Sequence, residues 1–225
     1  MLKEFISSVS IFNDLDDKTI REIEKLVSVR EYPKGSMVIL EEEFGDIVFI
    51  VMNGTVKITR VNDEGKEVIL AMLGEYEIFG EMAIIDGEAR SANALAQENC
   101  KLLAISSEDF IKILKDNFSV SLALMRELAK RLRKSDQHIE ALSLSDAEHR
   151  IGVSILNLAE EIGVIRRGKV TIENLPFQQD IANMSGTSRE TVSRILKLFE
   201  DRSLITKDGH KVLIPDYLYF KKCFG

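Results

Sequence analysis

The stretch Gly186-Thr187-Ser188-Arg189-Glu190-Thr191-Val192-Ser193-Arg194-Ile195-Leu196 holds the signals of a turn and of the helix that follows it. Gly186 gives the backbone the freedom that a tight bend needs, and Ser188 is a residue type that caps helices. The apolar positions recur at helical spacing and predict a buried stripe of Val192, Ile195, Leu196 and Phe199. A shorter helix is expected just before the turn, over 177–184. Two helices joined in this way are typical of a helix-turn-helix.

The face opposite this stripe carries side chains that suit the edges of base pairs. Arginine bonds O6 and N7 of guanine with two hydrogen bonds, and glutamate accepts one from N4 of cytosine. The first two turns of such a helix are the part that enters the major groove of double-stranded DNA. We therefore assign to DNA binding Ser188, Arg189, Glu190, Ser193, Arg194 and Lys197. Arg202, Lys207 and Lys211 are further candidate phosphate contacts, although each alone is an ordinary surface charge.

The charge of the chain is distributed unevenly. The formal net charge is −7, which is unusual for a DNA-binding protein. Residues 144–225 carry 12 Lys and Arg against 11 Asp and Glu, a balance of +1, whereas residues 1–143 carry 18 against 26, a balance of −8. DNA affinity depends on local rather than total charge, so the C-terminal part can present a basic face.

Length and composition favour a two-domain, cytoplasmic protein. The chain has 225 residues, of which 45% are hydrophobic, enough for two real cores. No apolar run reaches the roughly 18 residues that a bilayer requires, and the N-terminus lacks a secretory signal, so we expect no membrane association. Cys100 and Cys223 lie far apart and fit neither a disulfide framework nor a metal cluster, so we expect no metal site.

Between Val29 and Ile105, short β-rich runs alternate with Gly and Asn/Asp clusters. The predicted strands are Met37–Leu40, Ile47–Val51, Thr55–Val61, Val68–Leu73 and Lys101–Ile105. Their even spacing indicates an all-β barrel or jelly roll. Helical periodicity flanks this region, first over Leu15–Val27 behind an acidic cap and then from Ser107 to about Lys115.

The longest helical pattern runs from about Phe118 to Leu144 and carries a heptad seam. Its members, spaced alternately by four and three residues, are Ser121, Met125, Leu128, Leu132, Ser135, Ile139 and Leu142. Such a seam, with no second copy in the chain, predicts a parallel homodimer. Packing of the helix along its own β domain is the alternative.

The remaining residues predict a winged helix-turn-helix. Ser145-Asp146-Ala147-Glu148 has the spacing of a capping box that starts a new helix. Short β runs at Lys169–Ile172 and Lys211–Ile214 flank the helix pair, and Asp208-Gly209 marks a hairpin. The chain is thus expected to be an α+β protein with three parts. These are an N-terminal β-barrel of jelly-roll type over 1–116, a long dimerisation helix over 117–144 and a DNA-binding domain over 145–225.

A second group of residues, about a hundred positions before the helix-turn-helix, suits a small anion. Gly80-Glu81-Met82-Ala83 can form a helical turn whose N–H groups face an anion. Arg90 can make charge-assisted bonds to a phosphate, and Ser91 can add a hydroxyl. Glu81 can accept from a ribose hydroxyl. A structural ion pair between Arg90 and Glu81 that holds two β loops together is the alternative.

The two segments together resemble the cyclic AMP receptor protein (catabolite activator protein) and FNR superfamily of bacterial transcription regulators, over nearly the whole chain. Phe79-Gly80-Glu81-Met82-Ala83 followed by Arg90-Ser91-Ala92 is similar to the phosphate-binding cassette of cyclic-nucleotide-binding domains, one residue shorter between Glu81 and Arg90. The resemblance implies a ligand-responsive DNA-binding regulator, not an enzyme. It implies a cyclic nucleotide as effector, with cyclic AMP favoured, and no covalent cofactor.

The same resemblance implies that the long helix contributes to the pocket. Ser135-Asp136 stands where cyclic AMP receptor proteins have a Thr-Ser pair that meets the adenine from both subunits. Ser135 keeps the hydroxyl, whereas Asp136 could accept from an exocyclic amine or from N1–H of guanine, so the choice of base is open. Arg131 lies one turn earlier and could also reach the base.

The resemblance is strongest from Thr187 to Ile205, and it implies that Arg189, Glu190 and Arg194 read a palindromic operator with TGTGA-like half-sites. Ser193 departs from that pattern. FNR-type relatives carry a serine there and read a TTGAT-like half-site, but they lack an arginine at the place of Arg189. A surface for RNA polymerase would fall within Glu160–Lys169, by the same resemblance.

Three alternatives remain open. The first is a regulator of this family that is ligand-independent or senses another small molecule. Haem or an iron–sulfur cluster is disfavoured as that signal, because the N-terminal part has no cysteine cluster and no histidine precedes His138. The second is a cyclic-nucleotide-binding regulatory subunit that acts on a protein partner. The third, a cupin-type enzyme, is disfavoured, because it would need clustered histidines on its strands and the predicted β region has none.

Overall fold

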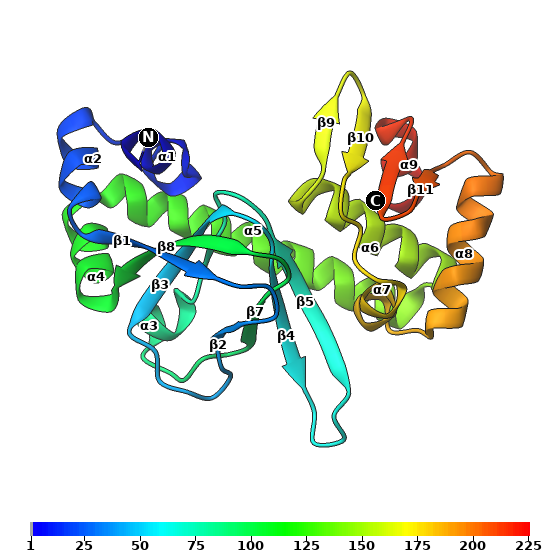
Figure 1. The fold of residues 1–225 in the computed structure, drawn as a ribbon, viewed down its shortest axis with the longest axis horizontal. Coiled ribbons are helices and arrows are strands. Elements are labelled where there is room, and N and C mark those ends of the chain that lie inside the picture. The colour runs from blue at the N-terminus through cyan, green and yellow to red at the C-terminus, as the bar shows by residue number, and fades with distance from the viewer. Residues whose placement is uncertain (1) are drawn as a thin grey trace. The chain divides into compact units, whose positions relative to one another are not determined.

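The computed structural model describes residues 2–225, which form two compact units. The first unit runs to Arg60 and resumes over Leu73–Arg133. The second unit combines Val61–Met72 with Lys134–Gly225. Figure 1 traces the order of the elements along the chain. Because segments distant in the sequence share a unit, packing rather than chain order defines each of them.

The β domain is built from eight strands in two sheets. The strands are β1 (Val27–Tyr32), β2 (Met37–Ile39), β3 (Ile47–Asn53), β4 (Val56–Val61), β5 (Glu67–Leu73), β6 (Ile78–Phe79), β7 (Asn93–Ala96) and β8 (Cys100–Ser106). They form two four-stranded sheets of order β1-β8-β3-β6 and β2-β7-β4-β5. The arrangement is a jelly roll of two sheets rather than one closed barrel. The predicted α+β class, with a jelly-roll domain before the long helix, is confirmed.

Five strands lie within two residues of their predicted ends, and three were not predicted. The first of the three, β1, begins at Val27, which was predicted to end a helix over Leu15–Val27. The helix α2 covers only Asp17–Glu24, so that predicted end was wrong. All six residues of β1 pair with β8, from Val27 opposite Ile105 to Tyr32 opposite Cys100. A partner strand from the far end of the domain therefore overrides the local helical pattern.

Helices close one side of this domain. They are α1 (Leu2–Ser8), a 3₁₀ turn (Ser10–Phe12), α2, α3 (Met82–Asp86) and α4 (Ser107–Asp116). The side chain of Asp16 caps α2 by accepting from the Thr19 N–H at 2.7 Å, as its acidic cap predicted. Fully buried Phe12 and Phe110 join the sheet residues Ile50 and Leu103 in the core.

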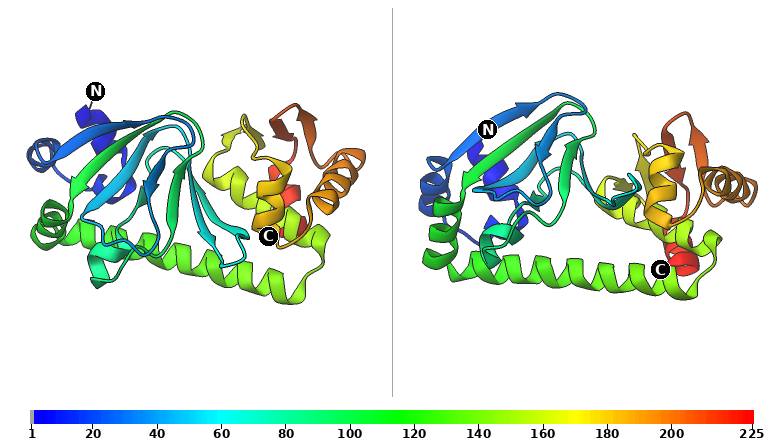
Figure 2. Two further views of the ribbon diagram at one scale, coloured as in Figure 1. Left: turned by 60° about the horizontal axis from the view of Figure 1, so that its bottom comes forward. Right: turned by 90° about the horizontal axis from the view of Figure 1, so that it is seen from below.

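The helix α5 spans Phe118–Leu144, the predicted range, and continues without interruption in both views of Figure 2. Its Val120 and Leu124 are buried in the core of the first unit. The heptad seam, in contrast, leaves large apolar side chains exposed to solvent: Met125 by 52%, Leu132 by 64%, Ile139 by 62% and Leu142 by 44%. None of the helices within residues 2–225 is long and apolar enough to cross a membrane.

The second unit contains the predicted winged helix-turn-helix. Its elements are α6 (Ala147–Glu161), β9 (Val164–Arg166), β10 (Lys169–Ile172), α7 (Gln178–Ser185), α8 (Arg189–Asp201), β11 (Thr206–Asp208), β12 (Lys211–Ile214) and α9 (Tyr217–Phe224). The strands form one sheet of order β11-β12-β10-β9. The two predicted β runs of this region match β10 and β12.

The start of α6 differs from the predicted capping box. The cap is Asp146, whose carboxylate accepts from the His149 N–H at 2.9 Å. The N–H of Ser145 is bonded to the Ala141 carbonyl at 3.0 Å, so Ser145 still continues the last turn of α5. The box was therefore placed one residue too early.

The C-terminal helix α9 was not predicted from the sequence, yet it completes the core of the second unit. Phe220 is fully buried, with its ring 6.0 Å from that of Phe199 and 4.9 Å from that of Phe224. Such edge-on and tilted ring pairs add to the free energy of burial. The helix thus covers the inner face of α6 and α8 with aromatic side chains.

We predict that Phe220→Ala lowers the free energy of unfolding by about 3–5 kcal/mol, because it leaves a cavity among packed rings. Leu218→Ala, on the same helix but 73% exposed, serves as the matched control and should change this quantity by less than about 0.5 kcal/mol. Urea unfolding followed by circular dichroism measures both. Equal effects of the two substitutions would show that α9 does not pack into the core.

Candidate functional sites

The predicted cassette forms a tight turn followed by the five-residue helix α3. Gly80 has φ +79°, a left-handed conformation that favours glycine. A Cβ at this position would lie 2.8 Å from Nη1 of Arg90 and 2.9 Å from Cδ1 of Ile39. Both the backbone and the close packing therefore require the glycine that the sequence places there.

Arg90 is buried at the centre of this region, with 6% of the residue exposed. Its guanidinium donates to the main-chain carbonyl of Ile47 at 2.7 Å and to that of Gly80. Burial lowers the pKa of Arg90, and the nearby carboxylates of Asp46 and Glu81 oppose that shift. Arginine titrates so high that it keeps its charge here.

The carboxylate of Glu81 is almost fully buried and is paired with an arginine of α5. Oε1 of Glu81 lies 3.0 Å from Nη1 of Arg131, whose Nη2 donates to the carbonyl of Ile78 at 2.6 Å. Burial raises the pKa of Glu81, and the charge of Arg131 opposes that shift. Among the ion pairs of residues 2–225, Glu81 is joined to Arg131 and not to Arg90. The structure therefore does not show the ion pair that was the alternative reading of Arg90 and Glu81.

The other predicted ligand residues are less enclosed. Ser91 is exposed beside Arg90, Met82 is 49% exposed on α3, and Ala83 is buried. Ser135 and Asp136 are both exposed on α5, four and five residues after Arg131, and belong to the second unit. The first unit thus brings together the cassette, Arg90 and Arg131.

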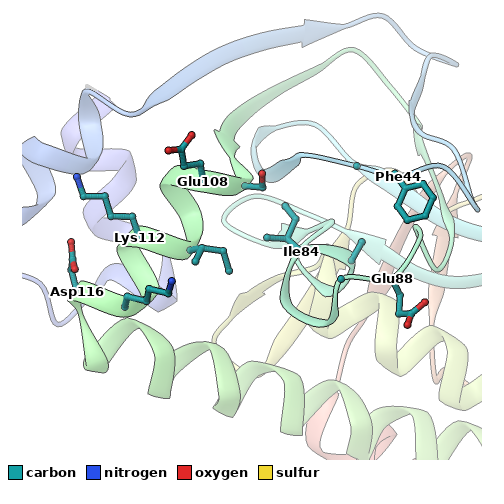
Figure 3. Close-up of a pocket in the computed structure, with 12 residues that line it drawn as sticks. Phe44, Ile84, Glu88, Glu108, Lys112 and Asp116 are labelled. Atoms are coloured by element: carbon teal, nitrogen blue, oxygen red, sulfur yellow. The ribbon is translucent and has the colours of Figure 1, made fainter.

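A cleft of about 680 Å³ is lined by residues of α3, of α4 and of the loop that holds Phe44 and Gly45. Figure 3 shows Ile84 between Phe44 and Glu88 on one side and the α4 residues Glu108, Lys112 and Asp116 on the other. Of the predicted ligand residues, Ala83 alone lines it. The charged side chains around it are of both signs, so it has no clear preference for an anion.

The helix-turn-helix has the local geometry that its sequence predicts. Gly186 ends α7 in the left-handed conformation, with φ 58°, and Ser188 caps α8 by accepting from the Thr191 N–H at 3.2 Å. The buried residues of α8 are the predicted stripe, Val192, Ile195, Leu196 and Phe199. This prediction is confirmed, because helical periodicity is a local property of the sequence.

The predicted base-reading side chains lie together on the opposite, solvent-facing side of α8. Arg189, Glu190, Ser193 and Arg194 are all exposed. Hydrogen bonds from its own backbone N–H and from Ser188 lower the pKa of Glu190, so it stays a carboxylate that can accept. Within residues 2–225 neither Arg189 nor Arg194 takes part in an ion pair.

The predicted phosphate contacts around this face are mostly engaged with acidic partners. Lys197 lies 3.1 Å from Asp201, Arg202 lies 2.6 Å from Glu148, and Lys211 lies 2.8 Å from Glu173. Such exposed pairs are weak and would exchange readily for a DNA phosphate.

Gly45 and the carbonyl of Ile47 also position Arg90, and neither was predicted from the sequence. Gly80, in contrast, belongs to the predicted cassette. Gly45 lies so close to Arg90 that a Cβ there would overlap the guanidinium group. The carbonyl of Ile47 belongs to the first residue of β3. No local pattern marks either residue, because each acts only through its distance from Arg90.

Two family models match the parts of the chain that hold these residues. Residues 29–117 match the Cyclic nucleotide-binding domain family, and residues 150–222 match the Crp-like helix-turn-helix domain family. The CRP-like cAMP-activated global transcriptional regulator of Mycobacterium tuberculosis is 30% identical over 215 residues, 96% of each chain. The Cyclic AMP receptor protein of Thermus thermophilus is 34% identical over 176 residues, 78% of each chain.

The fold agrees as well. The solved structure of FixK2 from Bradyrhizobium japonicum superimposes with a TM-score of 0.78 at 19% identity, covering 88% of this chain and 98% of that one.

We predict that Gly45→Ala displaces the Arg90 guanidinium and breaks its carbonyl hydrogen bonds. A buried polar group that loses its partners costs roughly 1–3 kcal/mol, so the melting temperature of the β domain should fall. The ¹⁵N resonance of Arg90 Nε should shift in the same variant. Phe44→Ala, at the adjacent and 87% exposed residue, is the control and should change neither quantity. An unchanged Arg90 resonance in Gly45→Ala would contradict this placement.

Proposed function

Because the chain belongs to the family of cyclic AMP receptor protein and FNR regulators, it is a ligand-responsive transcription regulator rather than an enzyme, and we propose that its effector is cyclic AMP. The observation that carries the proposal is Arg90, a buried cation whose hydrogen-bond partners are main-chain carbonyls. No carboxylate within residues 2–225 forms an ion pair with it. Since a buried charge without a directly paired carboxylate is costly, a bound anion would stabilise the site.

The residues around Arg90 match the parts of a cyclic nucleotide. We assign Arg90 and Ser91 to the phosphodiester, together with the backbone N–H groups of Met82 and Ala83. Glu81 is assigned to the ribose 2′-hydroxyl. Burial raises the pKa of Glu81 and Arg131 opposes that shift; as a carboxylate paired with Arg131, Glu81 can accept from this hydroxyl.

The base is assigned to α5. Ser135 supplies a hydroxyl, and the Asp136 carboxylate accepts from the exocyclic amine of adenine. Arg131 contributes through Glu81, to which it is bonded, rather than through the base. A guanine would offer N1–H to Asp136 instead, and this makes cyclic GMP the competing effector to be tested.

The seam of α5 is the proposed dimer contact. Its exposed Leu132 and Ile139 would be buried against the same residues of a second copy. Two copies would present two α8 helices to major grooves about 34 Å apart. Bound ligand beside Ser135 would favour the DNA-binding arrangement, to the extent of its differential affinity for the two states.

We propose a palindromic operator with TGTGA-like half-sites, read by Arg189, Glu190 and Arg194. The three side chains share the exposed face of α8. A contact with RNA polymerase is proposed for the β9–β10 hairpin. At its tip, Arg166 and Arg167 follow two exposed aliphatic residues, Val164 (47%) and Ile165 (57%).

The first test is isothermal titration calorimetry with cyclic AMP and with cyclic GMP. We expect saturable binding of cyclic AMP, and at least a hundredfold loss of affinity in Arg90→Leu, because a charge-assisted contact to the phosphate disappears. Arg60→Leu, which removes a 59% exposed arginine of β4, should bind normally. Binding of cyclic GMP alone would reassign the base contact of Asp136. Absence of heat with either nucleotide would leave a regulator of this family with another signal or none.

The second test is DNA binding by fluorescence anisotropy, with duplexes that carry two TGTGA half-sites or variants of one base pair. Arg189→Ala should weaken binding by about 1–3 kcal/mol and relax the preference at one position of each half-site. Lys197→Ala should weaken all duplexes alike, because a phosphate contact carries no sequence information. Lys221→Ala, on α9, should change neither quantity. Failure of the unmodified protein to bind any duplex would favour a regulatory subunit that acts on a protein partner.

A further inference from the structure

Arg150 connects the C-terminal end of α5 to the C-terminal end of α7. It lies in the first turn of α6, and its guanidinium reaches away from that helix. Nε donates to the Ser185 carbonyl at 2.8 Å, and Nη2 donates to the Gly186 carbonyl at 3.4 Å. Nη1 donates to the Ser145 carbonyl at 2.7 Å. Ser145 directly follows α5, whereas Ser185 and Gly186 form the end of α7 and the turn before α8.

The chemistry of these contacts suits a bridge between helices. The carbonyls at a helix C-terminus have no partner within the helix and carry partial negative charge, so a cation there is favourable. A planar guanidinium can serve carbonyls in different directions at once, which an ammonium on a flexible stem does poorly. Arg150 takes part in none of the ion pairs within residues 2–225, and its guanidinium donates instead to these three main-chain carbonyls.

Neighbouring contacts hold the same junction. The hydroxyls of Ser154 on α6 and Ser185 on α7 lie 2.9 Å apart, and both residues are buried. A Cβ on Gly186 would lie 2.9 Å from Cδ2 of Leu142, so the turn packs directly against the last turns of α5. The turn before α8 is therefore tied both to α6 and to the end of the long helix.

We propose that Arg150 is a positioning residue through which the C-terminal end of α5 sets the orientation of the turn and of α8. It touches neither the proposed effector nor DNA. This inference rests on the proposed function, because its consequence is that loss of Arg150 uncouples DNA affinity from effector binding. Without Arg150, a change in the position of the end of α5 no longer changes the orientation of α8.

The test measures the affinity for the palindromic duplex with and without saturating cyclic AMP, in Arg150→Met, Arg150→Lys and the control Lys221→Met. Lys221 also ties a neighbouring helix to α6, through Glu160 at 2.9 Å, and is 53% exposed. If the unmodified protein gains affinity by the usual 5–150-fold, Arg150→Met should reduce that ratio to within about threefold of unity. Arg150→Lys should restore part of it, and Lys221→Met should keep it. Calorimetric binding of cyclic AMP to the DNA-free variants should be unchanged.

A purely structural role gives a different result. Arg150→Met would then lower the melting temperature, and both DNA affinities would fall alike with their ratio intact; this outcome would overturn the proposal. If the unmodified protein does not respond to cyclic AMP, hydrogen exchange measured by mass spectrometry still tests the positioning role of Arg150 independently of the proposed function. Arg150→Met should speed exchange over 185–192 at least tenfold relative to Lys221→Met. Equal exchange in the two variants would refute the positioning role.

Discussion

A buried guanidinium without a carboxylate partner is the constraint on which the effector domain depends. Arg90 is surrounded by elements from three parts of the chain: the loop before β3, the turn before α3 and its own loop before β7. Glycines at 45 and 80 leave room for its planar group, and carbonyls take its hydrogen bonds. The nearby acidic residues favour its charge without forming a salt bridge. The domain thus holds a buried positive charge whose hydrogen-bond partners are main-chain carbonyls.

The pairing of Glu81 with Arg131 makes this arrangement possible. If Glu81 were bonded to Arg90, an incoming phosphodiester would have to displace a buried carboxylate, at considerable cost. Arg131 comes from α5 and takes Glu81 instead, so that the two arginines have separate partners. The same pair connects the cassette to the long helix that carries the apolar seam. In the proposed function, effector binding and dimer contact would therefore involve one helix.

The second unit uses an arginine in another way. Arg150 again donates to carbonyls, but these belong to the ends of helices rather than to β loops. Both arginines show that a guanidinium can organise a site through main-chain acceptors, which lie wherever the backbone brings them. The cassette motif predicted a role for Arg90, but no sequence motif predicted one for Arg150. The partners of Arg150 are main-chain carbonyls, which every residue carries.

Local patterns predicted the elements whose cause is local. The stripe of α8, the caps at Asp16 and Ser188 and the full length of α5 follow from periodicity and residue type, which need no distant partner. The sequence-based prediction failed where contact with a distant segment determines the secondary structure. Val27 lies in a strand because β8 pairs with it, and α9 forms because Phe199 offers an aromatic surface to cover. Asp146 rather than Ser145 caps α6 because the last turn of α5 still uses Ser145.

By itself the sequence determined the class of fold, the helix-turn-helix, the exposed face of α8 and the tight turn at Gly80. These depend on side-chain chemistry at fixed spacing along one element or turn. Only the tertiary structure decided the partners of the charged groups: Glu81 with Arg131, Arg90 with the carbonyls beside Gly45, and Arg150 with two helix ends. Pairings of this kind depend on distances between segments that lie far apart in the chain, and the spacing of residues within one segment does not encode them.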